Sequence, residues 1–189
     1  MNTVINALLI ALDAKDPASA AHCRNVALMT GRLTKHMVLP DTFSSLLQSA
    51  ALIHDVGKIG IPDAVLNYPC SLNRPGMAII RSHPDIGAQI LLNGDIPDSI
   101  IACVRHHHEF WDGSGYPSGL SGQDIPLGAR IIAVLDAIDA MCGQRCYRGA
   151  MPLSDCRGEI LRLRGKWYDP QVVDTLMENW ESVTDGLYP

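Results

Sequence analysis

Residues 46–58 read LLQSAALIHDVGK, an apolar stretch that runs into an adjacent histidine and aspartate. Its apolar residues recur at three- and four-residue spacing, which predicts an amphipathic helix. We expect this helix to end near Gly57 or Gly60, because glycine suits the left-handed position that follows a helix. The sequence therefore predicts a buried helix with His54 and Asp55 at its C-terminal end.

The His54-Asp55 pair is uncommon in a protein core, because both groups are costly to bury without partners. A neutral imidazole beside a carboxylate suits a divalent metal, and the carboxylate can bridge two ions. Lys58 lies four residues after His54, so a continued helical turn would put its ammonium on the same face. The alternative is a helix-end histidine bonded to its own aspartate, with Lys58 stabilising the helix dipole.

Helical periodicity continues on both sides of this segment, and no alternating run is long enough to predict a strand. Proline, glycine and capping residues bound the helical patterns. No internal repeat or dividing linker appears, so we predict an all-α fold in a single domain over residues 1–189, with no second domain. The expected helices cover residues 4–12, 18–36, 41 to about 57, 75–82, 84–92, 97–109, 129–141, 152–164 and 170–180.

The composition predicts a cytoplasmic globular domain. The 189 residues are 47% hydrophobic, which is ordinary for one well-filled core and argues against disorder. A formal net charge of −5 argues against a DNA-binding surface. The apolar run at residues 4–12 is too short for a membrane span, and no basic segment precedes it as in a secretory signal. Six cysteines form no CxxC pair, so we expect reduced thiols.

A second polar segment, HHEFWDGSGYP, covers residues 107–117. Two successive histidines cannot share one face of a regular helix, but at a fraying helix end both can turn toward one metal; a surface run of histidines is the alternative. Asp136 interrupts a strongly apolar helix and needs a buried partner. His22 and His83, taken singly, would more often be satisfied core histidines. Together the candidates are five histidines and two aspartates, a suitable ligand supply for a two-metal hydrolytic site.

The segments HDVGK (54–58) and HHEFWDGSGYP (107–117) together closely resemble the HD-GYP domain, a branch of the HD phosphohydrolase superfamily. The resemblance is strongest over residues 11–170 and includes IGIPD (59–63), HPDIG (83–87) and IPLGARIIAVLDAIDAM (125–141). It implies an HD-type helical bundle with a metal site between the central helices. It also implies phosphodiesterase activity on the bacterial second messenger cyclic di-GMP, giving pGpG and, after a second cut, GMP.

The resemblance further implies a binuclear metal site, with iron or manganese as the usual occupant. Asp55 would bridge the two ions and, with Lys58, would be catalytic. A solvent molecule shared by two cations loses its proton near neutral pH and attacks phosphorus, while Lys58 stabilises the phosphoryl charge. One ion is assigned to His22, His54 and Asp136, and the other to His83, His107 and His108.

The resemblance also suggests residues that contact the substrate. Arg145 and Arg148 match two basic positions that grip phosphates, although they could be solvated loop charges. The glycine-rich loop would place Gly115 and Tyr116 against the substrate, unless the glycines only make the turn and the tyrosine packs. Asp16 and Asp139 match positions near the nucleotide, whereas Glu109 and Asp112 would orient the ligand histidines or cap the loop.

Four departures from the family pattern stand out. Ala18 lies four residues before His22, where some members carry a glutamate that helps hold a third metal, so we expect two ions rather than three. Cys146 replaces a proline, and residues 67–71 and 73–76 differ from the usual loop and helix start, which puts the rate and base preference in doubt. Cys142 and Cys146 could form a redox pair, although buried spectator thiols are the simpler interpretation.

Two other functions stay open. The first is a catalytically silent module that senses the nucleotide or docks diguanylate cyclases, although a complete ligand set favours the enzyme. The second is a phosphodiesterase for another cyclic dinucleotide such as cyclic GMP–AMP, because no residue reads the base directly.

Overall fold

The computed structural model describes residues 2–92, 94–143 and 150–188, and over these residues the chain is helical. In the described part an isolated bridge between Arg164 and Tyr168 is the nearest approach to a strand, so the all-α prediction is confirmed. The α-helices are α1 (Asn2–Lys15), α2 (Pro17–Thr34), α3 (Asp41–Leu52), α4 (Asp63–Leu66), α5 (Arg74–Ile80), α6 (His83–Leu91), α7 (Asp98–His106), α8 (Leu127–Cys142), α9 (Leu153–Arg162), α10 (Pro170–Glu178) and α11 (Trp180–Thr184), with 3-10 turns η1 (Val56–Gly60) and η2 (Gly122–Asp124).

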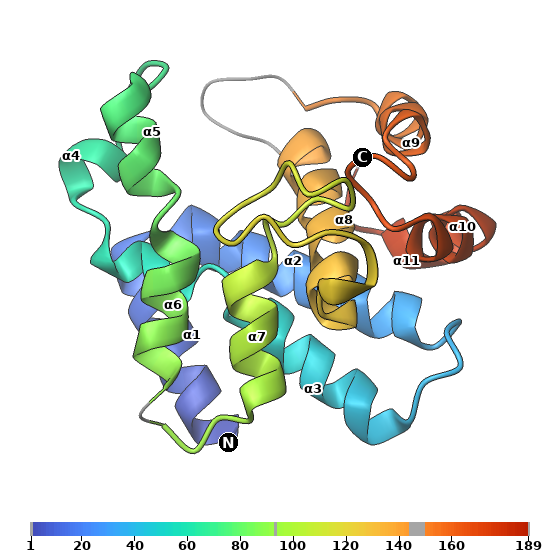
Figure 1. Cartoon of the computed structure of the whole chain (residues 1–189), viewed down its shortest axis with the longest axis horizontal. Coiled ribbons are helices and arrows are strands. Elements are labelled where there is room, and N and C mark those ends of the chain that lie inside the picture. Colours follow the sequence, from blue (N-terminus) through green and yellow to red (C-terminus); the bar gives the residue numbers. More distant parts are fainter. Residues whose placement is uncertain (1, 93, 144–149, 189) are drawn as a thin grey trace.

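Helix α2 crosses the middle of the molecule and packs on α1, α3 and α8, while α7 packs on α3, α6 and α8 (Figure 1). Side chains such as Leu33, Leu47, Ile53, Ile131 and Leu135 are fully buried where these helices meet. Each buried aliphatic side chain contributes about 1.5–3 kcal/mol through the hydrophobic effect. One large cluster of buried side chains thus holds the central helices in place, and a smaller cluster lies between α1 and α2. None of the described helices is long and apolar enough to cross a membrane.

The helix that decides the fold ends earlier than the sequence predicts. Helix α3 stops at Leu52, and the chain then forms the 3-10 turn η1, so the expected end near Gly57 or Gly60 is wrong. Neither glycine has a positive φ. A Cβ on Gly57 would lie 1.9 Å from the carbonyl oxygen of His83, so this glycine serves a close approach of η1 to α6 rather than a helix cap.

Other boundaries differ by a few residues. Helix α7 begins after Pro97 and ends at His106, so His107–Glu109 lie beyond it rather than within it. Helix α8 starts at Leu127 instead of Ala129. The short helices α4 and α11 were not expected, because single turns carry too few residues to show a period.

Candidate metal centre

Three of the predicted ligand histidines follow the ends of helices in the same way. Nδ1 of His54, His83 and His107 lies 2.8, 2.8 and 2.7 Å from the carbonyl oxygen three residues earlier, on Ala51, Ile80 and Val104 respectively. A carbonyl only accepts hydrogen bonds, so Nδ1 carries the proton and donates it. Each ring is thereby fixed with the lone pair of Nε2 available, which is the usual orientation of a metal-ligating histidine.

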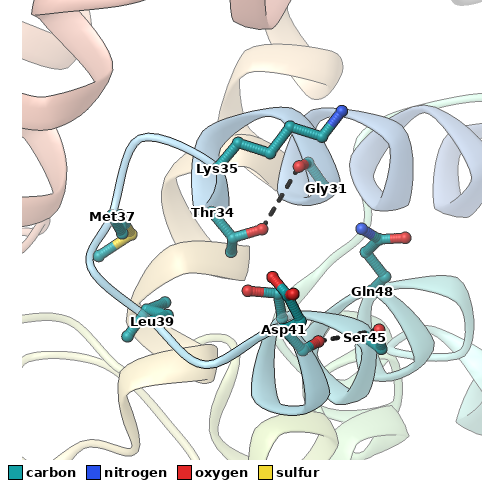
Figure 2. A pocket seen from close by; sticks show the side chains of 9 residues that line it. Gly31, Thr34, Lys35, Met37, Leu39, Asp41, Ser45 and Gln48 are labelled. Carbon is teal, nitrogen blue, oxygen red and sulfur yellow. Dashed lines mark hydrogen bonds between the residues drawn. The ribbon is translucent and has the colours of Figure 1, made fainter.

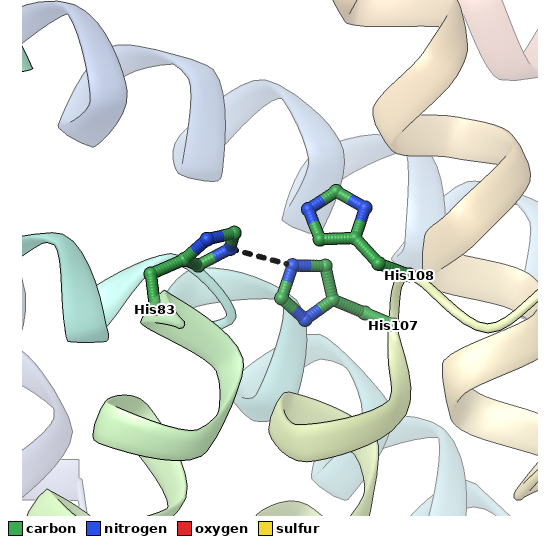
Figure 3. A group of neighbouring side chains, drawn as sticks. All are labelled: His83, His107 and His108. Carbon is green, nitrogen blue, oxygen red and sulfur yellow. Dashed lines mark hydrogen bonds between the residues drawn. The ribbon is translucent and has the colours of Figure 1, made fainter. Parts of the chain in front are cut away.

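His83, His107 and His108 form one group of donors, within 4.8 Å of one another (Figure 3). The Nε2 atoms of His83 and His107 are 3.2 Å apart. Both rings already donate through Nδ1, so two lone pairs face each other across this gap. A cation that both nitrogens can bind removes the repulsion, and the donor set therefore fits a divalent metal.

His22, His54 and Asp136 form a second group, with donor atoms also within 4.8 Å of one another. His22 Nε2 lies 2.9 Å from Asp136 Oδ1, which supplies the partner expected for an aspartate in the apolar helix α8. His54 is fully buried, and its Nε2 has no hydrogen-bond partner among the described residues. A buried nitrogen without a partner is costly, so this group also fits a metal ion.

Asp55 lies between the two groups. Its Oδ1 is 3.1 Å from His83 Nε2, whereas its Oδ2 is 3.7 Å from His54 Nε2 and 3.9 Å from His22 Nε2. One carboxylate oxygen thus faces each group, and the side chain is only 4% exposed. The structure thus brings Asp55 together with the six other predicted ligands.

The charges of Asp55, His54 and His107 suit metal ligation. Burial acts to raise the pKa of Asp55, but the Lys58 ammonium and nearby histidines hold it well below its usual range. Burial lowers the pKa of His54 and His107, so both rings are neutral at physiological pH. Burial also raises the pKa of the Cys23 thiol, 3.7 Å from His54, which leaves it protonated and a poor ligand.

Lys58 is placed by η1 rather than by a continued α-helical turn. Its Nζ donates to Asp55 Oδ2 at 2.6 Å and to Ser19 Oγ at 3.1 Å. Ser19 in turn bonds to Asp16, the N-cap of α2. The expectation that Lys58 shares a helical face with His54 is therefore wrong. Asp16, predicted near the nucleotide, caps the helix that carries His22.

Asp139 lies beside His22, one of the predicted ligands. It is buried, and its Oδ2 accepts from His22 Nδ1 at 2.6 Å. Its Oδ1 accepts from Asn25 Nδ2 at 2.9 Å and from the Tyr188 hydroxyl at 2.7 Å. These bonds occupy both oxygens and place Asp139 to orient His22, whereas its predicted contact with the nucleotide stays a prediction. Asn25 and Tyr188 were missed, since neither belongs to a motif.

The glycine-rich loop that contains Gly115 and Tyr116 covers one side of the group formed by His83, His107 and His108. The Tyr116 ring stacks on His108 with centroids 4.9 Å apart, and Cζ of the exposed Arg81 lies 5.1 Å from the centroid of the tyrosine ring, in a cation–π contact. A Cβ on Gly115 would come within 2.5 Å of the backbone at His108 and Glu109, so this glycine allows the loop to pack on the segment that carries the histidines. Arg81 lies outside the motifs and was not predicted from the sequence.

Glu109 and Asp112 hold this loop. Glu109 Oε1 accepts from the backbone of Ser118 at 2.6 Å, and Asp112 Oδ1 accepts from the backbone and hydroxyl of Ser114 at 2.9 and 2.6 Å. These contacts match the loop-capping alternative rather than orientation of the ligand histidines. Arg145, Arg148 and Cys146 lie outside the described residues, so their predicted roles stay predictions.

A cavity of about 290 Å³ lies elsewhere, between the C-terminal end of α2 and the start of α3 (Figure 2). Its lining includes Lys35, Asp41 and Gln48 but none of the predicted site residues. This cavity is therefore separate from the histidine and aspartate groups.

Comparison with known proteins identifies a family and several relatives of this chain. A family model described as HD domain matches residues 7–172. A cyclic di-GMP phosphodiesterase of Thermotoga maritima is 36% identical over 184 residues, which cover 96% of this chain and 50% of that protein. The 3'3'-cGAMP-specific phosphodiesterase 2 of Vibrio cholerae is 35% identical over 173 residues, covering 90% of this chain and 33% of that protein. This chain thus spans half or less of each relative.

A solved structure shares the fold. The HD domain of the L. monocytogenes phosphodiesterase PgpH, in complex with cyclic-di-AMP, matches with a TM-score of 0.70 at 18% identity. The match covers 96% of this chain and 97% of that one. The helical arrangement of Figure 1 is therefore one that a phosphodiesterase domain also adopts.

Proposed function

This chain belongs to the HD domain family, and from that premise we propose that it is a metal-dependent phosphodiesterase that hydrolyses a cyclic dinucleotide. The observation that carries the proposal is the position of Asp55 between two groups of buried donors. A single carboxylate that faces three histidine donors on one side and a His–His–Asp set on the other is suited to two neighbouring cations.

In this proposal one ion is held by His22, His54 and Asp136, the other by His83, His107 and His108, and Asp55 is shared. Imidazole and carboxylate donors without a thiolate agree with iron or manganese. When bound, two such ions lower the pKa of coordinated solvent and neutralise charge on phosphoryl oxygens. The chain contributes by fixing the rings through Nδ1 and by keeping the donors buried.

Lys58 has a separate role in the proposed reaction. Burial acts to lower the pKa of Lys58, but the neighbouring Asp55 keeps it above its ordinary value, so the side chain is cationic. Its side chain is 21% exposed, next to the shared carboxylate. We assign it to stabilising negative charge on the phosphoryl group, with Ser19 holding the ammonium in position.

The substrate proposed first is cyclic di-GMP, with pGpG and then GMP as products. The relatives named above act on cyclic di-GMP or on 3'3'-cGAMP at almost equal identity to this chain, so the base preference is the open part of the proposal. Arg145 and Arg148 are assigned to the phosphates, where guanidinium groups can bind in a bidentate manner.

The test compares the two nucleotides on one preparation. The full chain is purified, loaded anaerobically with Fe²⁺ or Mn²⁺, and incubated in parallel with cyclic di-GMP and 3'3'-cGAMP. We expect conversion of cyclic di-GMP to the linear dinucleotide, abolished by EDTA and absent in Asp55→Asn. Faster turnover of 3'3'-cGAMP would reassign the substrate but keep the enzyme.

A silent module that senses the nucleotide or docks diguanylate cyclases is the competing function. It predicts nucleotide binding without turnover in a chain that carries its full complement of metal. The complete donor set favours the enzyme, because a site that no longer catalyses a reaction would be expected to lose metal ligands first.

A further inference from the structure

The chain beyond α11 returns to the helices that carry the metal centre. Arg32 of α2 donates through Nη1 to the carbonyl oxygens of Val183 and Asp185, at 3.1 and 2.7 Å. These bonds satisfy carbonyls at the end of α11 and bring the following residues against α2. The segment that follows α11 reaches α8, where Tyr188 bonds to Asp139. This segment is outside residues 7–172, over which the family model matches.

Tyr188, in this segment, begins a chain of hydrogen bonds that leads to the metal centre. Its hydroxyl donates to Asp139 Oδ1 at 2.7 Å, Asp139 Oδ2 accepts from His22 Nδ1 at 2.6 Å, and His22 Nε2 faces Asp136 at 2.9 Å. Asp139 is 5% exposed, so water has little access to replace a lost donor. The carboxylate that orients His22 is thus itself held from two sides, by Asn25 and by Tyr188.

We propose that Tyr188 is a positioning residue of the metal centre, which acts through Asp139 to hold His22 in the orientation that binds the ion. The inference rests on the proposed function, because it needs the His22 group to be a metal site. A carboxylate with one oxygen bonded to a phenol and an amide has a fixed plane, and that plane sets the direction of the His22 ring. The segment beyond the family match therefore contributes to metal affinity.

The alternative role of Tyr188 is packing. Its ring lies against the core, and its hydroxyl is 3.9 Å from Met29 Sδ. Tyr188→Phe keeps the ring and removes only the donor, so it separates the two roles. Tyr168→Phe is the matched control, since Tyr168 is a buried tyrosine of the core that is not among the described hydrogen-bond donors to Asp139.

The experiment measures Mn²⁺ affinity of the full-length metal-free chain by calorimetry at constant pH, with thermal unfolding as a check of folding. Loss of an outer partner of a metal-ligating histidine typically weakens binding 10–100-fold. Tyr188 is one bond further away, so we expect Tyr188→Phe to weaken one ion by roughly 3–10-fold. Tyr168→Phe should leave both affinities within error of wild type.

A double-mutant cycle identifies the route of the effect. In an Asp139→Asn background, or in His22→Ala if that variant does not fold, Tyr188→Phe should cause no further loss of affinity. The inference is overturned if Tyr188→Phe lowers Mn²⁺ affinity equally in the wild-type and the Asp139→Asn (or His22→Ala) backgrounds, or does not lower it in the wild-type background. Either result leaves the proposed function intact. A wild-type chain that binds no Mn²⁺ overturns both.

Discussion

At the scale of the residue, the centre is organised by helix-end carbonyl groups. The last carbonyls of a helix lack intrahelical partners, and here those of Ala51, Ile80 and Val104 accept from histidine Nδ1. A histidine three residues after such a carbonyl is thus fixed in one tautomer with no additional side chain. His22 lies within α2 and lacks this option, which is why it uses Asp139.

Asp55→Ala should abolish turnover and sharply reduce the bound metal, because it removes the carboxylate that lies between the two donor groups. We expect a larger loss of affinity than the 10–100-fold typical of an outer partner. Elemental analysis and turnover assays check this. The control is Asp13→Ala, which removes an exposed aspartate paired with Arg24. Metal content and activity near wild type in Asp55→Ala would refute the site assignment.

Arg145→Ala and Arg148→Ala should raise KM more than they lower kcat, if both side chains grip phosphate equally in the ground and transition states. Each charge-assisted bond is worth about 1.5–3 kcal/mol. Steady-state kinetics on the preferred nucleotide measure the effect. An unchanged KM in both variants would identify the two arginines as solvated loop charges.

At the scale of the element, close packing between η1 and α6 brings Asp55 to His83. Gly57 faces the backbone of His83 and Gly87 at distances that leave no room for a side chain. Since Asp55 directly precedes η1 and α6 begins with His83, the separation of these two elements sets the 3.1 Å approach of carboxylate and imidazole. A glycine that looks like a helix stop in the sequence thus determines the geometry of the site.

Gly57→Ala should destabilise the chain by about 3 kcal/mol, the upper end for overpacking, because the clash is with backbone rather than with a flexible side chain. Mn²⁺ affinity should fall as well, since Asp55 and His83 are pushed apart. Denaturant unfolding and calorimetry measure the two effects.

Gly158→Ala is the matched control for Gly57→Ala. Gly158 lies within α9, and a Cβ there would meet nothing within 4 Å. The control should be stabilised by roughly 0.5–1 kcal/mol, with metal affinity unchanged. Equal effects of the two substitutions would contradict the packing argument.

At the scale of the whole molecule, seven polar ligands come from five separate segments of one core. α2, the α3–η1 connection, α6, the end of α7 and α8 each supply one or two donors. Metal binding should therefore stabilise the fold as a unit, because a ligand set of this kind exists only in the native state.

The metal count should be two ions per chain. Ala18 lies one turn before His22 on α2, where a third ion would need a donor, and alanine has none. A chain loaded anaerobically with Mn²⁺ should bind close to two ions in elemental analysis. At a free concentration of 100 times Kd, each site should add about 2.7 kcal/mol of stability, seen as a rise in Tm that EDTA reverses. Three tightly held ions would show that another ligand exists.

The sequence by itself determined the all-α class and the identities of the candidate ligands. Helical periods are local, so they follow from spacing along the chain, and His54-Asp55 and HHEFWDGSGYP are contiguous motifs. The division of the ligands into His22 with His54 and Asp136, and His83 with His107 and His108, was likewise predicted from the resemblance. The structure brings together the same two groups.

Only the tertiary structure decided the end of α3, the close approach of Gly57 to His83, and the contacts of Asp139 with His22 and Tyr188. A helix end depends on what the following residues pack against, and local propensity does not contain that information. A hydrogen bond between residues 49 positions apart, as from Tyr188 to Asp139, leaves no periodic trace in the chain. Such contacts follow from the packing of whole helices, because the packed core sets the position of every side chain that faces it.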